Sequence, residues 1–280
     1  MLEVVLATFA LLLLIAGTYS DIRTREVPDW VNLSGIVAGI GIRALYGFIE
    51  HDWSALGWGL LGFVVFFALS IIMYYSGQWG GGDSKLLMAM GALLGLEFSR
   101  NSIGIAFLLW VVLAGAGYGL VWSLALAVKN WRAFISRFAA IETPLSWVRL
   151  PMLGILVLGF AFAIATNDEL LRVLLMILGL LVPVLFYTAI GVKAVENCCM
   201  YKLLPVGKLT EGDWIAKIVK IKGKYICGPK DLGIKKEQIQ QLKKLHVKEI
   251  LVREGVPFVP SFLIAFLLAL WLGSPLAWFV

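Results

Sequence analysis

Two aspartates in this sequence lie beside long apolar runs, where an ionisable side chain is unusual. Asp21 follows the apolar run Leu2–Ser20, and Asp83 follows three glycines where another apolar run begins. Charged side chains at or within a membrane span are costly and mark functional sites. Two carboxylates held close together share one proton, so one can take a proton from water while the other donates to a carbonyl oxygen. This pair would therefore suit the chemistry of an aspartic protease.

Each aspartate also has an ordinary structural explanation. Asp21 could simply end a span, and Asp83 could cap a helix that the chain enters from a glycine turn. The glycine run Gly80–Gly82 favours irregular backbone and lets another backbone approach closely. A helix that needs about 20 residues to cross a bilayer would begin near Gly77, which would place Asp83 more than one turn inside it.

The composition shows what must position these aspartates. Apolar residues make up 60% of the chain, charged residues 15%, and the mean hydropathy is +0.89. Because a soluble domain is nearer a quarter charged, the chain is predicted to be a polytopic membrane protein. Its three cysteines and two histidines form no disulfide framework or zinc pattern. The apolar N-terminus is expected to be a retained first span and not a cleaved signal.

Apolar stretches of the length that crosses a bilayer recur along the chain. They predict an all-α membrane protein of about eight transmembrane helices, or six if the sixth and seventh stretches form a re-entrant pair. Close helix packing in lipid is expected at Gly35, Gly39, Gly91 and Gly95, and in the cluster Gly115–Gly119. The eight stretches are Leu2–Ser20, Trp30–Ile49, Ser54–Tyr75, Gly82–Leu96, Ser102–Val128, Pro151–Ala165, Leu170–Ile190 and Val256–Trp278.

Charge in the connections predicts sidedness, because Lys and Arg concentrate in short cytoplasmic loops. With the N-terminus outside, the outer connections are mainly acidic and both termini face outward. Both aspartates then lie at the cytoplasmic boundary of the membrane, since the first span ends on the side where the fourth begins. The inner connections hold Arg23, Arg25, Lys85, Lys129, Arg132, Arg137 and Arg149. The outer connections hold Glu50, Asp52, Glu97, Asp168 and Glu169, against only Arg100 and Arg172.

One segment is too polar to lie in the membrane. Residues 191–255 contain fourteen Lys or Arg and seven Asp or Glu. Short strands are expected over Trp214–Ile221 and Val247–Val252, with a helix between them whose apolar face carries Ile239, Leu242 and Leu245. The predicted domains are thus 1–190, a basic cytoplasmic α/β domain over 191–255, and a final span over 256–280. The basic charge of residues 191–255 reflects positive-inside bias, attraction to anionic lipid head groups, or both.

Three segments carry a specific resemblance. Gly80-Gly81-Gly82-Asp83 matches the GxGD motif of intramembrane aspartic proteases, and the stretch Asp21–Trp30 resembles the first-aspartate region of type IV prepilin peptidases. The similarity is closest to the archaeal preflagellin peptidase branch. The segment Arg253–Pro260 resembles the start of that branch's last span.

The resemblance implies a membrane-embedded endopeptidase that cleaves short basic leader peptides from archaellin or type IV pilin precursors at the cytoplasmic face. By motif, Asp21 and Asp83 would be the catalytic pair, with Gly80 and Gly82 shaping the loop. No metal or other cofactor is expected for the chemistry, and no nucleic-acid partner. The chain lacks the paired CxxC motifs of many bacterial relatives, so we expect neither a structural zinc nor methyltransferase activity.

Two further expectations concern charges near the membrane. Glu26 and Asp29 are predicted to receive the basic residues of the leader by charge complementarity, unless these acids pair with Arg23 and Arg25 instead. Arg43, within the second span, is expected to extend outward or to pair with Glu50. A transporter is the alternative from another functional class, because transporters also place carboxylates and glycine-broken helices in the membrane. No internal symmetry of the kind common in transporters is apparent.

Overall fold

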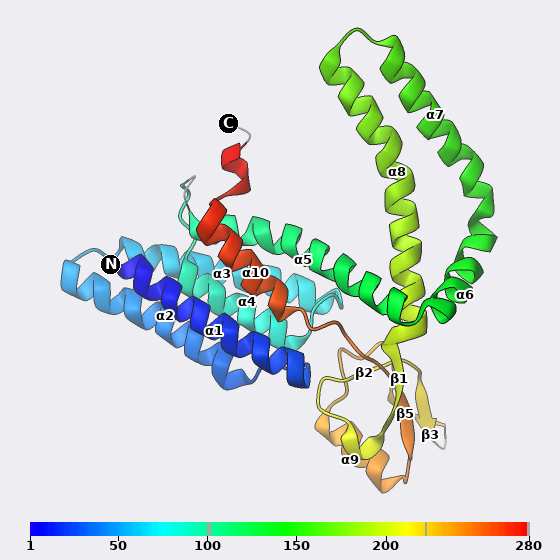
Figure 1. Cartoon of the computed structure of the whole chain (residues 1–280). Helices are drawn as coiled ribbons and strands as arrows, with labels where there is room; N and C mark the ends of the chain where they lie inside the picture. Colours follow the sequence, from blue (N-terminus) through cyan, green and yellow to red (C-terminus); the bar gives the residue numbers. More distant parts are fainter. Residues whose placement is uncertain (100–101, 222, 279–280) are drawn as a thin grey trace. The chain divides into compact units, whose positions relative to one another are not determined.

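The structure is a computed structural model that describes residues 1–99, 102–221 and 223–278. It is mostly helical, with a small region of strands near the C-terminus (Figure 1). The principal helices are α1 (Leu2–Thr24), α2 (Asp29–Glu50), α3 (Ser54–Tyr75), α4 (Gly81–Leu94), α5 (Ile103–Lys129), α6 (Trp131–Glu142), α7 (Arg149–Ala165), α8 (Glu169–Val195), α9 (Lys236–Lys244) and α10 (Val259–Leu272). The strands are β1 (Tyr201–Pro205), β2 (Trp214–Ile215), β3 (Val219–Ile221), β4 (Lys224–Cys227) and β5 (Glu249–Arg253).

Each of the eight predicted apolar stretches contains a helix. Within the described residues, six helical segments are long and apolar enough to cross a membrane. They are α1, α2, α3, α5, the continuous segment Trp131–Ala165 and the segment Glu169–Met200. The helices α4 and α10 have only 14 residues each. The chain is therefore a multi-pass membrane protein, and the count of eight spans stays a prediction.

The chain forms two compact units, each with its own packing. The first comprises Met1–Gly119, Leu204–Ile250 and Gly255–Val280, and the second comprises Leu120–Leu203 and Leu251–Glu254. The predicted division at residues 190 and 255 follows polarity along the sequence and stays a prediction.

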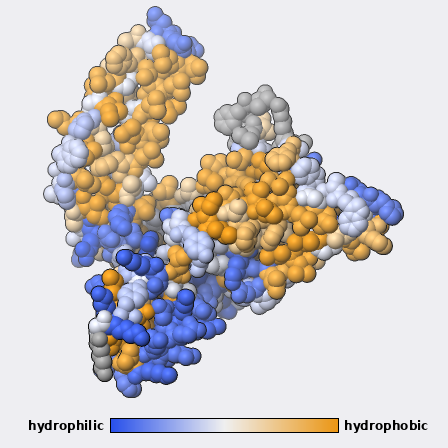
Figure 2. All heavy atoms as spheres, turned by 180° about the vertical axis from the view of Figure 1, so that it is seen from behind, coloured by the Kyte–Doolittle hydropathy of each residue, from blue (hydrophilic) through white to orange (hydrophobic). Residues whose placement is uncertain are grey.

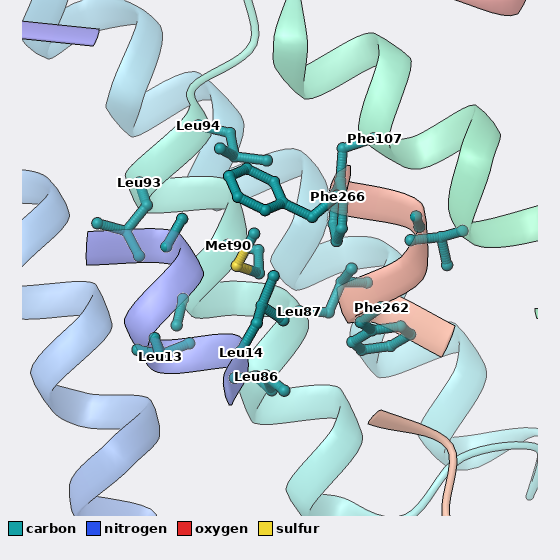
Figure 3. Close-up of a cluster of buried hydrophobic side chains, with 14 of the residues drawn as sticks. Leu13, Leu14, Leu86, Leu87, Met90, Leu93, Leu94, Phe107, Phe262 and Phe266 are labelled. Atoms are coloured by element: carbon teal, nitrogen blue, oxygen red, sulfur yellow. The ribbon is translucent and has the colours of Figure 1, made fainter. Parts of the chain in front are cut away.

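In the first unit α4 is the central helix, packed against α1, α2 and α3. Its residues from Leu86 to Leu94 are buried except Met88, which is half-buried. Figure 3 shows the apolar cluster beside it, to which α1 adds Leu14, α5 adds Phe107 and α10 adds Phe262. Because protein surrounds α4, the helix can be short and begin with irregular backbone without exposing polar groups to lipid.

Small residues let the helices of this core come close together. A Cβ atom on Gly39 would lie 2.7 Å from the backbone of Ala92, and one on Gly91 would lie 2.6 Å from the carbonyl oxygen of Gly62. The packing role predicted for the glycines in α2 and α4 is confirmed. The prediction is wrong for Gly117 and Gly119, which have open space around them on α5.

Arg43 is buried inside this unit, contrary to the expectation that it extends outward. Only 2% of its surface is exposed, and its guanidinium donates to the carbonyl oxygens of Ala55 at 3.0 Å and Leu93 at 2.9 Å. Leu93 lies in the last turn of α4, where a helix leaves backbone carbonyls without an internal partner, whereas Ala55 lies in the first turn of α3. Arg43 therefore binds helix ends and does not pair with Glu50.

The second unit contains a helical hairpin in which α7 runs up and α8 returns beside it (Figure 1). The two helices meet at Gly159 and Gly179, where a Cβ on Gly159 would lie 3.2 Å from the Cα of Gly179. Arg149 at the start of α7 forms an ion pair with Glu142 at the end of α6. Leu150 and Ile164 leave more than three quarters of their surface exposed, as expected of side chains that face lipid.

The polar segment folds into a small α/β region. Its strands form a three-stranded sheet in the order β1-β5-β2 and a separate antiparallel pair, β3 and β4. The predicted helix is present as α9 and buries Ile239 and Leu242, whereas Leu245 lies just beyond its end and is exposed. Figure 2 shows that hydrophilic side chains gather on this region, while apolar side chains cover most of the helical surface.

Candidate active site

Asp21 lies in the last turn of α1 and is almost completely buried, with 4% of its surface exposed. Its Oδ2 accepts a hydrogen bond of 2.9 Å from the backbone N–H of Val259. Val259 is the first residue of α10, and an N–H at that position has no partner within its own helix. The carboxylate of α1 therefore satisfies the N-terminus of α10, where the helix dipole also favours a negative charge.

Asp83 is the third residue of α4 and is half-buried. Its Oδ2 accepts a hydrogen bond of 3.2 Å from the backbone N–H of Gly80, just before the helix. The expectation that this helix begins near Gly77 is wrong. Gly77 has a φ of 69°, a left-handed conformation that ends the preceding turn, so α4 begins at Gly81 and Asp83 lies in its first turn.

The two carboxylates lie at the same end of the antiparallel helices α1 and α4. They are close enough for the charge of Asp21 to act on Asp83. Tyr118 on α5 lies within range of the charge of Asp21 as well. The two acids, 62 positions apart in the sequence, therefore lie within electrostatic range of each other at one end of these two helices.

The two motif glycines occupy different environments. A Cβ on Gly82 would lie 3.0 Å from the backbone nitrogen of Val27 and 3.4 Å from its Cβ. The loop after α1 and the first turn of α4 therefore touch backbone to backbone at Gly82. A Cβ on Gly80 would meet only the Oδ2 of Asp83, at an ordinary 3.5 Å. Close approach accordingly explains the glycine at position 82 and does not explain the one at position 80.

The predicted leader-binding acids lie in the connection from α1 to α2. Glu26 is exposed, and Asp29 forms an exposed ion pair of 2.6 Å with Lys85, two residues after Asp83. The two arginines nearby in sequence make contacts of their own. Arg23 lies 5.0 Å from the ring centre of Tyr19, and Arg25 donates to the carbonyl oxygen of Gly255 at 3.1 Å.

Two contacts around the aspartates could not be predicted from the sequence. The backbone N–H of Val259 is a group that every residue but proline carries, so no side-chain pattern could identify it. Trp79, directly before the glycine run, packs its ring against Phe258 and Phe262 of the α10 region. The resemblance over Arg253–Pro260 pointed to the right part of the chain without indicating either contact.

Among the residues that the structure describes, no cluster of three or more His, Cys, Asp or Glu side chains could hold a metal ion. The cysteines Cys198, Cys199 and Cys227 are free thiols.

The part of the chain that contains both aspartates is similar to known proteins. Residues 8–120 match the model of the type IV leader peptidase family. The chain is 40% identical over 82 residues to a preflagellin peptidase of Methanocaldococcus jannaschii and 39% identical over 82 residues to one of Methanococcus maripaludis. It is 30% identical over 84 residues to a preflagellin peptidase of Methanococcus voltae.

These matches cover 29%, 29% and 30% of this chain, and 34%, 35% and 36% of the respective relatives. The chain thus matches about a third of the length of these curated relatives. No solved structure matches it. The resemblance deduced from the motifs is confirmed over the first helices, which include Asp21 and Asp83.

Proposed function

We propose that this protein is a membrane-embedded aspartic endopeptidase. Its residues 8–120 match the model of the type IV leader peptidase family. The observation that carries the proposal is the meeting of Asp21 and Asp83 at one end of α1 and α4, inside the matched segment. Two acidic side chains at one end of a helical bundle are the minimum that such chemistry needs.

In the proposed reaction the two aspartates work as one unit with a single proton between them. The ionised member takes a proton from water, and the oxygen of that water attacks the scissile carbonyl carbon. The protonated member donates its proton to the carbonyl oxygen. Collapse of the tetrahedral intermediate then breaks the C–N bond and re-forms a carbonyl group. One hydroxyl returns its proton to the carboxylate that had donated, and the proton taken from water passes to the departing amine. Because a coupled pair titrates as a unit, neither role is assigned to one residue.

The proposed substrates are archaellin or type IV pilin precursors with short basic leader peptides. The preflagellin peptidases among the relatives support this class. Glu26 and the Asp29–Lys85 pair lie in or beside the loop that adjoins the two aspartates. We propose that an arriving leader Lys or Arg binds Glu26 and competes with Lys85 for Asp29, which would place the cleavage point near the carboxylates.

The basic charge of the connections supports a cytoplasmic location for this end of the bundle. In this orientation the basic segment 191–255 is a cytoplasmic domain near anionic lipid head groups, and both termini face outward. The leader of a precursor is basic and would be held on the same side by the same rule.

The proposal is tested with purified protein in liposomes and a precursor that carries a short basic leader. Product N-termini are identified by mass spectrometry. Wild type should cleave one bond, whereas Asp21→Asn and Asp83→Asn should each lower the rate by at least about a thousandfold, because each removes one half of the acid–base pair.

Asp52→Asn is the matched control. Asp52 is an exposed aspartate before α3 that accepts the Ser54 N–H, a bond that asparagine can also accept. This variant should cleave at the wild-type rate. If folded wild type leaves the precursors intact, the peptidase proposal is wrong and the transporter alternative gains weight. If cleavage survives either substitution of the pair, the assignment of that residue is wrong.

A further inference from the structure

We infer that the first turn of α10 positions both aspartates of the proposed peptidase, by binding Asp21 directly and by holding the loop that carries Asp83. The inference rests on the proposed function and assigns a role to a helix outside the segment that matches the peptidase family, residues 8–120. It follows from contacts made by three consecutive parts of the chain: the segment before α10, the first residue of α10 and the first buried aromatic side chain of α10.

The first contact orients Asp21. The Val259 N–H donates to Oδ2 at 2.9 Å, and both residues are buried. A hydrogen bond from a fixed backbone group restricts the rotation of the carboxylate, which a flexible side-chain donor would not do as well. Because this N–H belongs to the first residue of the helix, no helical hydrogen bond competes for it.

The second contact holds the loop before Asp83. The ring of Trp79 lies with its centre 5.6 Å from that of Phe258 and 5.3 Å from that of Phe262. Aromatic pairs at this separation contribute beyond the area they bury. Gly80, the next residue, donates its N–H to Asp83. Trp79 therefore links α10 to Asp83 through a single intervening residue.

Two further contacts keep α10 in place against α1. Arg25, one turn after Asp21, donates to the carbonyl oxygen of Gly255 at 3.1 Å. A Cβ on Gly17, one turn before Asp21, would lie 3.4 Å from a methyl group of Val259. The start of α10 is thus held on both sides of Asp21, so a shift of α10 would move the donor and the Trp79 site together.

The sharpest test removes only the Val259 N–H. In a semisynthetic full-length chain, α-hydroxyisovaleric acid replaces Val259, so an ester oxygen takes the place of the N–H and the side chain is unchanged. We expect the kcat for precursor cleavage to fall roughly ten- to hundredfold, as for loss of a hydrogen bond to a charged group. The KM should stay within about twofold, because the bond orients a reacting group and does not touch the leader.

The matched control is the same ester replacement at Ile264, in the middle of α10, which removes one helical hydrogen bond and no contact with Asp21. Its kcat should stay within about threefold of wild type, since a bond far from the dyad is lost. A normal kcat in the Val259 ester, or an equal loss in both esters, would overturn the inference.

The loop contact is tested separately with Trp79. Trp79→Ala should lower kcat about tenfold at unchanged KM, and Trp79→Phe should restore most of it, because a smaller ring can still pack on Phe258. Trp271→Ala, at the exposed far end of α10, should have no effect. Equal kcat values for Trp79→Ala and wild type would overturn this half of the inference.

A measurement without catalysis separates the inference from the proposed function. In a chain whose three cysteines are replaced by serine, Trp79→Cys and Phe258→Cys should be joined by a short bifunctional thiol reagent, because the two wild-type rings have their centres 5.6 Å apart. If this cross-link forms but wild type cleaves no precursor, the packing holds and the proposed function is wrong, which removes the catalytic role of α10. If wild type cleaves and no cross-link forms, the inference is wrong while the peptidase assignment stands.

Discussion

Gly82→Ala is expected to impair the proposed peptidase, whereas Gly80→Ala is not, although both glycines belong to the same motif. The added methyl group at position 82 would lie 3.0 Å from the backbone nitrogen of Val27, a distance that real Cβ contacts rarely reach. Val27 lies in the loop after α1 and is only 6% exposed, so its backbone cannot simply rotate away. The first turn of α4 would have to move, and Asp83 is the next residue.

The size of the effect follows from this overlap. Overpacking of a well-filled site by a methyl group typically costs about 1–3 kcal/mol. If Asp83 is displaced and this cost appears in full as a higher activation free energy for cleavage, kcat should fall by roughly fivefold to more than a hundredfold. At position 80 the φ of −70° suits alanine, and the nearest atom would be at 3.5 Å. Gly80→Ala should therefore stay within about threefold of wild type.

The assay is precursor cleavage under kcat conditions, with the Tm of each variant measured in the same detergent. The loss of kcat for Gly82→Ala should exceed any loss for Gly80→Ala, with both proteins folded at the assay temperature. An equally active Gly82→Ala variant would refute the close-approach argument. An equal loss in both variants would show that flexibility of the loop, and not space, requires the glycines.

Three other predictions follow from single contacts. Arg43→Met should lower the free energy of unfolding by roughly 2–5 kcal/mol, because the carbonyl oxygens of Ala55 and Leu93 lose a buried charged donor. The loss is measured as a lower Tm, and a Tm equal to that of wild type would contradict the prediction. The double variant Glu26→Gln with Asp29→Asn should have a higher KM than wild type for a precursor with a basic leader at low salt, and this difference in KM should fade at high salt. If the kinetics at low salt are unchanged, these two acids do not bind the leader. Burial, together with the nearby charge of Asp231, raises the pKa of the Cys227 thiol to about 11, so the thiol stays protonated at pH 8. Cys227 should therefore react with maleimide far more slowly in the native protein than after unfolding. Equal rates would contradict its burial.

The sequence predicted the helices well because the bilayer imposes length and polarity on each span. The same argument failed at the start of α4, since it counted Gly77–Gly80 as helix although the bundle encloses a shorter one. A helix surrounded by protein need not match the bilayer, and nothing in the local sequence distinguishes it from a span that faces lipid.

Side-chain partners were harder to predict than helices. The outward or paired Arg43 was a reasonable expectation for a long side chain near a helix end, but burial against the carbonyls of two other helices depends on tertiary packing. Asp29 has its ion pair with Lys85, 56 positions away, and not with the arginines nearby in sequence. Both cases show that charge along the sequence indicates where partners are needed and not which residues supply them.

The two aspartates were predicted from residue type and topology, since the fourth span was expected to begin on the side of the membrane where the first ends. Their surroundings were not. The Val259 donor lies 238 positions from Asp21, and it is a backbone group with no distinguishing side chain. Only the folded chain brings α10 to the carboxylates.

The central claim is that Asp21 and Asp83 act as one catalytic unit, and a double-mutant cycle tests it most directly. Single-turnover cleavage rates are measured for wild type, Asp21→Asn, Asp83→Asn and the double variant, with Asp52→Asn as control. Residues that act as a unit lose their contribution together, so the double variant should be no slower than either single variant. Losses that multiply in the double variant, or a single variant that retains activity near wild type, would contradict the account.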